Sequence, residues 1–144
     1  MGGMNILVEQ VAHKFGCAIN EQNLEALTEL MPEGHRFVDS LGRVMKGRET
    51  VRAGWVEYFK MVADYSIDLQ ETFSKGPVVV MTGLAQGSYA VGGKLTPEYR
   101  WSTPAVFRAF VEDGKIVEWR VYADNEPVRK RMRKKGVVAA EQIS

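Results

Sequence analysis

The sequence has a single cysteine, Cys17, and no long apolar run. One cysteine excludes an internal disulfide and any zinc site built from cysteine ligands. A transmembrane helix needs about 20 consecutive apolar residues, and no stretch of the chain approaches that length. The start of the chain, MGGMNILVEQ, also lacks the basic residues and the cleavage site of a signal peptide. We therefore expect a cytoplasmic protein that has no disulfide and no membrane partner.

Positive charge is scarce in most of the chain and concentrated near its end. Residues 129–135 hold six basic side chains, and removing these six from the 19 Lys and Arg leaves 13 basic against 18 acidic residues. The remainder therefore carries a net charge of about −5 and offers no footprint for a polyanion. The basic run contains no aromatic residue that could stack on a base. We expect a solvated helix end and tail there, and no nucleic-acid partner.

Helical periodicity dominates the first part of the chain, where apolar residues recur every three or four positions in three stretches. Asn23 precedes the second stretch in the position of an N-cap, and Pro32 ends it. The expected helices cover about residues 5–20, the short stretch after Asn23, and about residues 48–62.

From Asp64 onward, apolar and polar residues alternate, which is the period of a β-strand. Asp113-Gly114 is a strong signal for a two-residue hairpin turn. A shorter hairpin is expected before the third helix, at residues 35–38 and 44–46. The four long strands are expected from residue 65 to near 75, and at 78–89, 100–112 and 115–123.

Helices followed by strands predict an α+β domain. We expect a cone in which three N-terminal helices pack in a strongly curved antiparallel sheet. A cavity at the open end of such a cone is the natural place for a ligand. The length of 144 residues suits one domain. We place that domain at residues 1–128, and assign residues 129–144 to a basic helix end and tail.

Three short sequence motifs occur along the chain in an order typical of one fold superfamily. They are Phe-Val-Asp-Ser-Leu-Gly at residues 37–42, Gly-Arg-Glu at 47–49, and Asp-Gly-Lys-Ile-Val-Glu-Trp-Arg at 113–120. With this order, the chain resembles the nuclear transport factor 2-like superfamily, and within it the SnoaL-like polyketide cyclases and the ketosteroid isomerases. The resemblance covers about residues 8–124. It implies a cystatin-like cone, a pocket for a small apolar molecule, and a homodimer that pairs through the convex face of the sheet.

Asp39 is the acid that this resemblance singles out. In ketosteroid isomerases, an aspartate at the end of the first short strand is the general base, and Asp39 matches it. If Asp39 lies among Phe15, Trp55 and Trp119, desolvation would raise its pKa and give a base active near neutral pH. Alternatively, Asp39 accepts hydrogen bonds from the backbone of the turn at residues 40–42. Both interpretations stay open.

The other groups of the isomerase mechanism are missing. Its oxyanion hole has a tyrosine on the first helix and a protonated acid on the third long strand. Phe15 and Val106 stand at those positions, with Ala105 as the alternative if the strand register slips. Trp55 matches a supporting tyrosine, and none of these groups can donate a short hydrogen bond to an enolate there. Losing one such donor costs about 2.7–4 kcal/mol, which argues against steroid isomerisation by that mechanism.

The expected pocket is lined by aromatic and apolar side chains, for each of which core filling is the alternative. In limonene epoxide hydrolases, another branch of the superfamily, an aspartate occupies the position of Val121. The Arg-x-Asp pair of those hydrolases is also absent from this sequence. We therefore do not expect the epoxide hydrolase mechanism either. We expect Tyr122 and Asp124 on the opposite face of the last strand. The expected ligand contacts are Phe15, Trp55, Phe59, Trp101, Val106, Trp119 and Val121.

Two functions remain open from the sequence. One is an isomerase, cyclase or lyase in which Asp39 shuttles a proton on an apolar or aromatic substrate. The other is a non-catalytic module for ligand binding or dimerisation. We expect no cofactor and no metal, because His13 and Cys17 lie one helical turn apart without a third ligand. His35 is expected at the surface, and Arg108 is expected to point away from the core.

Overall fold

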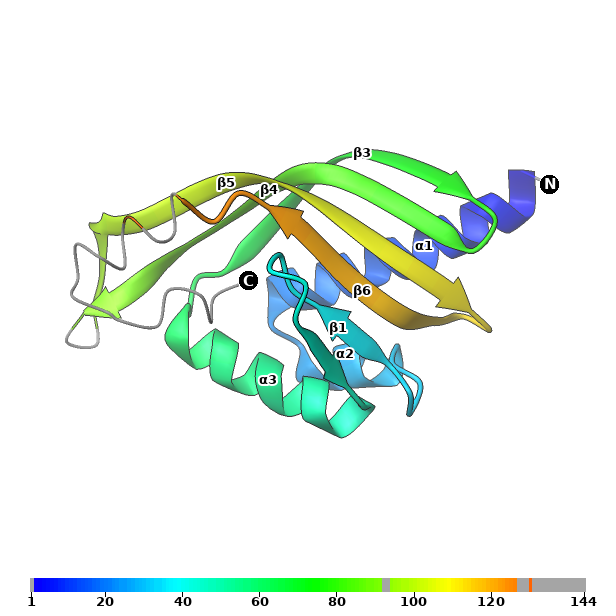
Figure 1. Cartoon of the computed structure of the whole chain (residues 1–144), viewed down its shortest axis with the longest axis horizontal. Coiled ribbons are helices and arrows are strands. Elements are labelled where there is room, and N and C mark those ends of the chain that lie inside the picture. Colours follow the sequence, from blue (N-terminus) through cyan, green and yellow to red (C-terminus); the bar gives the residue numbers. More distant parts are fainter. Residues whose placement is uncertain (1, 92–93, 127–129, 131–144) are drawn as a thin grey trace.

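The computed structural model describes residues 2–91, 94–126 and 130. Helices come first and long strands follow, in the order expected from the sequence (Figure 1). The last strand has the expected bounds, whereas the two before it extend further toward the turn that joins them. The elements are α1 (Gly2–Glu21), α2 (Leu24–Glu29), β1 (Arg36–Val38), β2 (Val44–Lys46), α3 (Arg48–Met61), β3 (Ser66–Lys75), β4 (Val78–Val91), β5 (Lys94–Glu112) and β6 (Lys115–Ala123).

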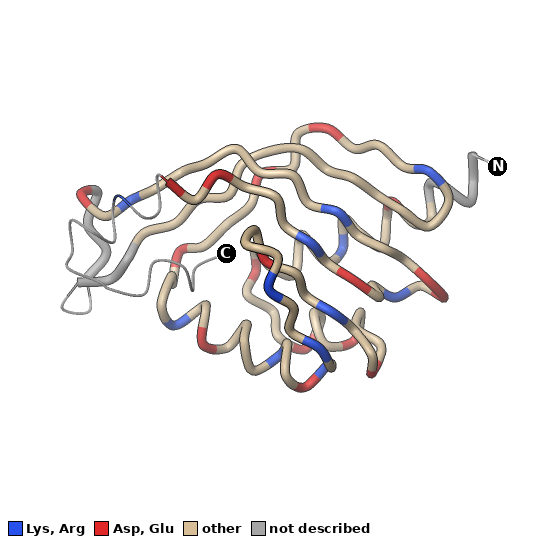
Figure 2. Tube along the Cα trace, viewed as in Figure 1, with Lys and Arg blue, Asp and Glu red and all other residues tan. Residues whose placement is uncertain are grey.

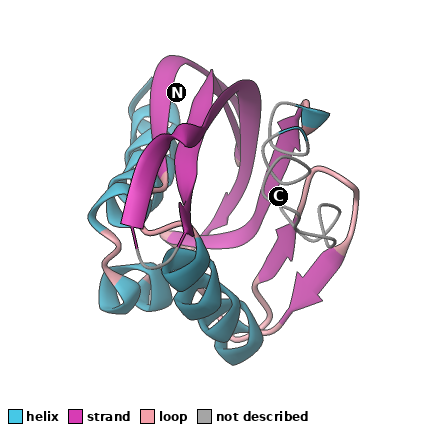
Figure 3. Cartoon of the chain, turned by 90° about the vertical axis from the view of Figure 1, so that its left-hand side faces the viewer, coloured by secondary structure: helices cyan, strands magenta, loops and turns pink. Residues whose placement is uncertain are grey.

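The strands form one six-stranded sheet in the order β2-β1-β6-β5-β4-β3. Every neighbouring pair is antiparallel except β1 and β6, which run parallel. The sheet bends over the helices, so the molecule is an open half-cone (Figure 3). α1 lies under the long strands and contacts β3, β4, β5 and β6, while α3 contacts β1 and β2. The expected α+β cone is confirmed, with the β1–β6 pair as its one parallel pair.

Local signals in the sequence set several element ends. Asn23 caps α2 by accepting a hydrogen bond from the backbone N–H of Ala26 at 3.1 Å. Asp113 and Gly114 both have positive φ, 51° and 71°, as a tight turn between right-twisted strands requires. Residues 113–114 thus join β5 to β6 as expected.

The centre of the cone is filled by aromatic side chains. Phe15 of α1 and Phe107 of β5 are fully buried, and each packs against Trp119 of β6, with ring centroids 4.7 Å and 5.8 Å apart. Along β5 the odd-numbered residues from Trp101 to Val111 are buried, because alternate side chains share a face. Burying each large apolar side chain contributes about 1.5–3 kcal/mol, so this cluster stabilises the contact between α1 and the sheet.

The outer face of the sheet carries a charged cluster around Glu118. Its carboxylate lies 3.2 Å from Arg36, 3.2 Å from Arg108 and 3.5 Å from Arg120. Figure 2 shows acidic and basic positions close together where β1, β6 and β5 lie side by side. Arg108 therefore points away from the core, as expected. Tyr122 is also exposed on this face.

The expected basic helix end and tail at residues 129–144 lie outside the described residues, apart from Lys130. Within the described ranges, no helix has the length and apolar character needed to span a bilayer.

Candidate functional site

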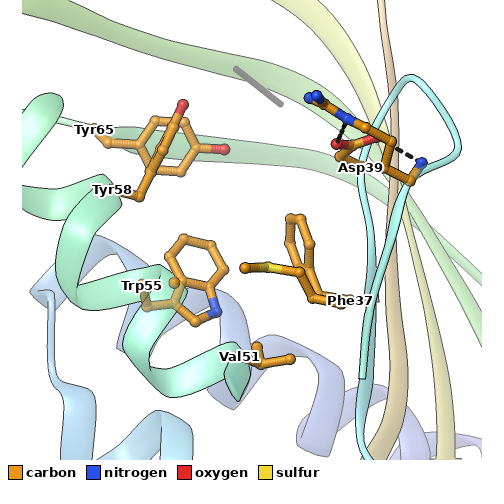
Figure 4. Close-up of a pocket in the computed structure, with 9 residues that line it drawn as sticks. Phe37, Asp39, Val51, Trp55, Tyr58 and Tyr65 are labelled. Carbon is orange, nitrogen blue, oxygen red and sulfur yellow. Dashed lines mark hydrogen bonds and ion pairs between the residues drawn. The ribbon is translucent and has the colours of Figure 1, made fainter. Parts of the chain in front are cut away.

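A cavity of about 270 Å³ lies between the β1–β2 hairpin and α3 (Figure 4). The hairpin supplies one wall and α3 supplies the other. Tyr65, the residue before β3, completes the cavity. Its lining is mostly apolar and aromatic, with a few polar groups, which is the usual character of a small-molecule site. The lining residues are Phe37, Asp39, Arg43, Met45, Val51, Gly54, Trp55, Tyr58 and Tyr65.

Trp55 forms the apolar base of the cavity. It lies one helical turn after Val51 and one before Tyr58, so all three share the face of α3 that looks toward the hairpin (Figure 4). The indole meets Phe37 edge to face, with centroids 5.6 Å apart. Gly54 allows the hairpin to approach closely, because a Cβ there would lie 2.7 Å from Cε of Met45. The two walls are therefore in contact at the base and apart above it.

Asp39 lines the hairpin wall and also holds the turn that follows β1. Its Oδ1 accepts hydrogen bonds from the backbone N–H groups of Leu41 and Arg43, both at 2.9 Å, and its Oδ2 accepts one from Nε of Arg43 at 2.8 Å. Gly42 gives the turn its positive φ of 83°. A carboxylate has about four lone-pair sites, so these contacts leave one, on Oδ2. Asp39 therefore accepts the hydrogen bonds of the turn, as one of the two interpretations expects, and it also lines the cavity; its role as a base stays a prediction.

Two tyrosines face the cavity from the opposite wall. The Tyr65 ring packs edge to face on Tyr58 with centroids 4.9 Å apart, and its hydroxyl points into the space between α3 and the hairpin (Figure 4). Tyr65 is 5% exposed, and burial raises its pKa, so the phenol stays protonated at neutral pH. Among the described residues, none forms a hydrogen bond with this hydroxyl. The indole N–H of Trp55 likewise has no partner there.

The family model for the SnoaL-like domain matches residues 12–119, most of the chain. The chain belongs to the SnoaL-like family. The match spans the segments that build the cavity, from the hairpin through α3 to Tyr65. No curated protein matches this sequence.

Solved structures share the fold of this SnoaL-like protein at low identity. A candidate SnoaL-like polyketide cyclase from Shewanella denitrificans OS-217 is 17% identical, with a TM-score of 0.77 over 88% of this chain and 97% of that chain. IdmH, a candidate polyketide cyclase from Streptomyces antibioticus, is 19% identical, with a TM-score of 0.72 over 88% and 98%. An LEH-like epoxide hydrolase from M. tuberculosis is 13% identical, with a TM-score of 0.73 over 90% and 92%. At these identities the comparisons establish the fold alone.

Of the eight site residues expected from the sequence, the SnoaL-like structure places Asp39 and Trp55 on the cavity wall. Phe59 and Trp101 lie behind that wall, where Phe59 packs on Trp55 at 5.3 Å and Trp101 packs on Tyr65 at 6.1 Å between ring centroids. They support the lining rather than form it.

The remaining expected contacts do not line this cavity. Phe15, Trp119 and Val121 are buried in the centre of the cone. Val106 is a clear correction: it lies opposite Tyr122 on the outer face, because β5 turns its odd-numbered residues inward. Ala105 occupies the inward position that the alternative register had offered.

His35 corrects a further expectation, because it is fully buried and not at the surface. Its Nδ1 donates a hydrogen bond to the carbonyl of Ile116 at 2.6 Å, and its ring lies 5.9 Å from that of Phe15. Burial lowers the pKa of His35, since the charged imidazolium is disfavoured away from water. No described residue binds its Nε2.

Seven of the nine lining residues were not among the expected contacts. Tyr58 could have been found from its helical spacing to Trp55, and Phe37 from its place in the expected short strand, where it lies opposite Trp119 of β6. Tyr65 and Arg43 gave no local signal, since only the folded arrangement brings the start of β3 near the turn of the hairpin.

Proposed function

We propose that this SnoaL-like protein binds a small, ring-bearing apolar molecule in the cavity between the hairpin and α3. We also propose that Asp39 acts on it as a proton shuttle in an isomerase, cyclase or lyase step. The observation that carries the proposal is that the carboxylate of Asp39 and the hydroxyl of Tyr65 face one apolar cavity from opposite walls.

The walls favour a flat ligand. Trp55 and Phe37 offer aromatic surfaces at the base, and Tyr58 and Tyr65 offer two more at the side. Aromatic rings pack well against such surfaces in edge-to-face or offset geometry. Met45 adds an adaptable apolar contact, since a thioether adjusts to ligands of different outline.

The chemistry assigned to Asp39 uses the lone pair that its turn contacts leave on Oδ2. Oδ2 takes a proton from the carbon beside a ligand carbonyl, which leaves an enolate, and the same carboxyl group returns the proton to that carbon or to another. Proton and electron counts are unchanged over the cycle, so no cofactor is required. Its side chain is 11% exposed, so the transfer takes place largely out of water.

Deuterium exchange into 1-indanone tests this function without knowledge of the natural substrate. In heavy water, the protein should accelerate deuterium incorporation beside the carbonyl, as measured by mass spectrometry. Asp39→Asn should abolish the acceleration, whereas Asp68→Asn, a change at an exposed aspartate on β3, should retain it. Acceleration that survives Asp39→Asn would exclude Asp39 as the base. If the wild-type protein binds 1-indanone without accelerating exchange, the proposed proton transfer is refuted and the proposed binding of a ring-bearing molecule still stands.

A homodimer paired through the outer face of the sheet is the second part of the proposal. Phe73 is 57% exposed and Tyr122 is 48% exposed on this face. The half-buried Val80 lies beside Phe73, and Val106 lies beside Tyr122, so each exposed aromatic ring has an apolar neighbour on the next strand. Such a surface on a curved sheet suits a self-complementary interface. Light scattering should give twice the chain mass for the wild type and the monomer mass for Phe73→Glu. A monomeric wild type at high micromolar concentration would refute the dimer.

A further inference from the structure

The polar atoms that the cavity leaves without partners are nearly all hydrogen-bond donors. Asp39, the strongest acceptor, already accepts three N–H groups. Nε of Arg43 is used by that contact, and no described residue pairs with its two Nη atoms. Tyr65 adds a hydroxyl that faces the cavity and has no hydrogen-bond partner among the described residues. A ligand that completes these groups must therefore bring an acceptor.

We propose that the Tyr65 hydroxyl donates a hydrogen bond to an acceptor oxygen, a carbonyl or enolate, on a ligand of one or two rings. Tyr65 would thus be the specificity-determining residue of the cavity, which neither the family match nor the solved relatives assign. The inference rests on the proposed binding function and names its ligand class.

The position of the Tyr65 hydroxyl is fixed before any ligand arrives. The ring is held by three aromatic neighbours, with centroids 4.9 Å away at Tyr58, 6.1 Å at Trp101 and 6.4 Å at Trp55. A side chain held this firmly loses little freedom on binding, so its hydrogen bond contributes more to affinity and to orientation. The hydroxyl borders the cavity, so a ligand oxygen can reach it without any rearrangement of the ring.

The protonation state of Tyr65 decides which kind of ligand atom it recognises. Burial keeps the phenol neutral, so its O–H is available to an oxygen acceptor. The guanidinium of Arg43, on the opposite wall, can only donate. A hydrocarbon would offer neither group an acceptor, and a ligand with donors alone would meet mostly other donors.

The cavity volume limits the size of the ligand. A dry protein cavity of about 150 Å³ is large enough to hold benzene. The cavity here, about 270 Å³, is less than twice that size. One ring with substituents, or two fused rings, therefore fits between the walls.

Indane and 1-indanone form a matched pair of probes, because they share the fused two-ring skeleton and differ by one carbonyl oxygen. Affinities are measured by calorimetry and by the change in fluorescence of the three tryptophans, of which Trp55 lines the cavity. The wild type should bind both probes and prefer 1-indanone by at least about fivefold, the effect of one net hydrogen bond. Tyr65→Phe should remove the preference and leave the affinity for indane unchanged. Tyr122→Phe, which removes a hydroxyl on the outer face, is the matched control and should keep the preference.

Each result has one meaning. Equal affinities of the wild type for the two probes overturn the assignment of an oxygen ligand, and this comparison does not depend on any variant folding. A preference that persists in Tyr65→Phe, with an unchanged thermal midpoint, overturns the role of Tyr65. Failure of the wild type to bind either probe would refute the proposed binding function itself.

Discussion

The turn contacts of Asp39 and the proton transfer proposed for it can be separated by comparing Asp39→Ala with Asp39→Asn. The alanine variant removes every acceptor from the turn: the backbone N–H groups of Leu41 and Arg43 lose Oδ1, and the Arg43 guanidinium loses Oδ2. The asparagine variant keeps an oxygen for the two backbone groups and loses only the ion pair. Both should lose proton transfer, and only the alanine should also loosen the turn.

The expected loss of stability follows from the exposure of these groups. Each backbone hydrogen bond contributes about 1 kcal/mol, and both donors lie in exposed residues that water can reach after the change. We therefore expect Asp39→Ala to lower the free energy of unfolding by about 1–2 kcal/mol. The ion pair is weak because the Arg43 side chain is 44% exposed, so Asp39→Asn should cost only about 0.2–1 kcal/mol.

Urea unfolding followed by circular dichroism measures both losses, and an unchanged slope would show that the two variants unfold from the same native state. Asp68→Ala serves as the control, since among the described residues its exposed side chain accepts a hydrogen bond from Gln70 alone, at 3.2 Å. Equal destabilisation by Asp39→Ala and Asp39→Asn would refute the reasoning, because the stability of the turn would then come from the ion pair and not from the backbone hydrogen bonds. No destabilisation by Asp39→Ala would show that the backbone contacts contribute nothing.

Two further predictions concern the core. Because burial lowers the pKa of His35 below 6.5, the unfolded chain binds a proton that the folded chain does not, so the free energy of unfolding should fall as the pH drops below that value. Urea unfolding at several pH values should show a steeper fall in the wild type than in His35→Asn, and equal slopes would contradict the assignment. Gly83→Ala should destabilise by about 1–3 kcal/mol or more, because a Cβ there would lie 1.7 Å from the carbonyl oxygen of Asp68. Gly34→Ala, where a Cβ meets nothing within 4 Å, should have little effect. Urea unfolding measures both glycine variants, and equal losses would contradict the steric explanation.

Much of the fold could be predicted from the sequence because its signals are local. Asn23 has the side chain of an N-cap, Asp113-Gly114 has the backbone freedom of a tight turn, and the alternation from Asp64 onward is the period of a strand. Such features depend on neighbours along the chain, so they hold before any tertiary contact is known.

The site was predicted less well because its composition depends on packing between distant segments. Val106 was placed inward by resemblance, and a shift of one residue moves a strand side chain to the other face. His35 looked like a surface residue, but the β1–β6 pairing carries it into the core beside Ile116. Phe15 and Trp119 are aromatic residues near the right place, yet they pack on each other. Their contact fills the space where a larger pocket would lie.

The parallel pairing of β1 with β6 has a consequence for how the protein is made. Arg36 and Glu118 are 82 positions apart, so the hairpin that carries Asp39 cannot pair with β6 until the ribosome has released β6. Contacts between such distant segments form slowly, because a long loop must close before they gain any stability. The hairpin wall of the cavity should therefore be the last part of the cone to assemble during synthesis. A nascent chain stalled before β6 would present its helices and first long strands without this cavity.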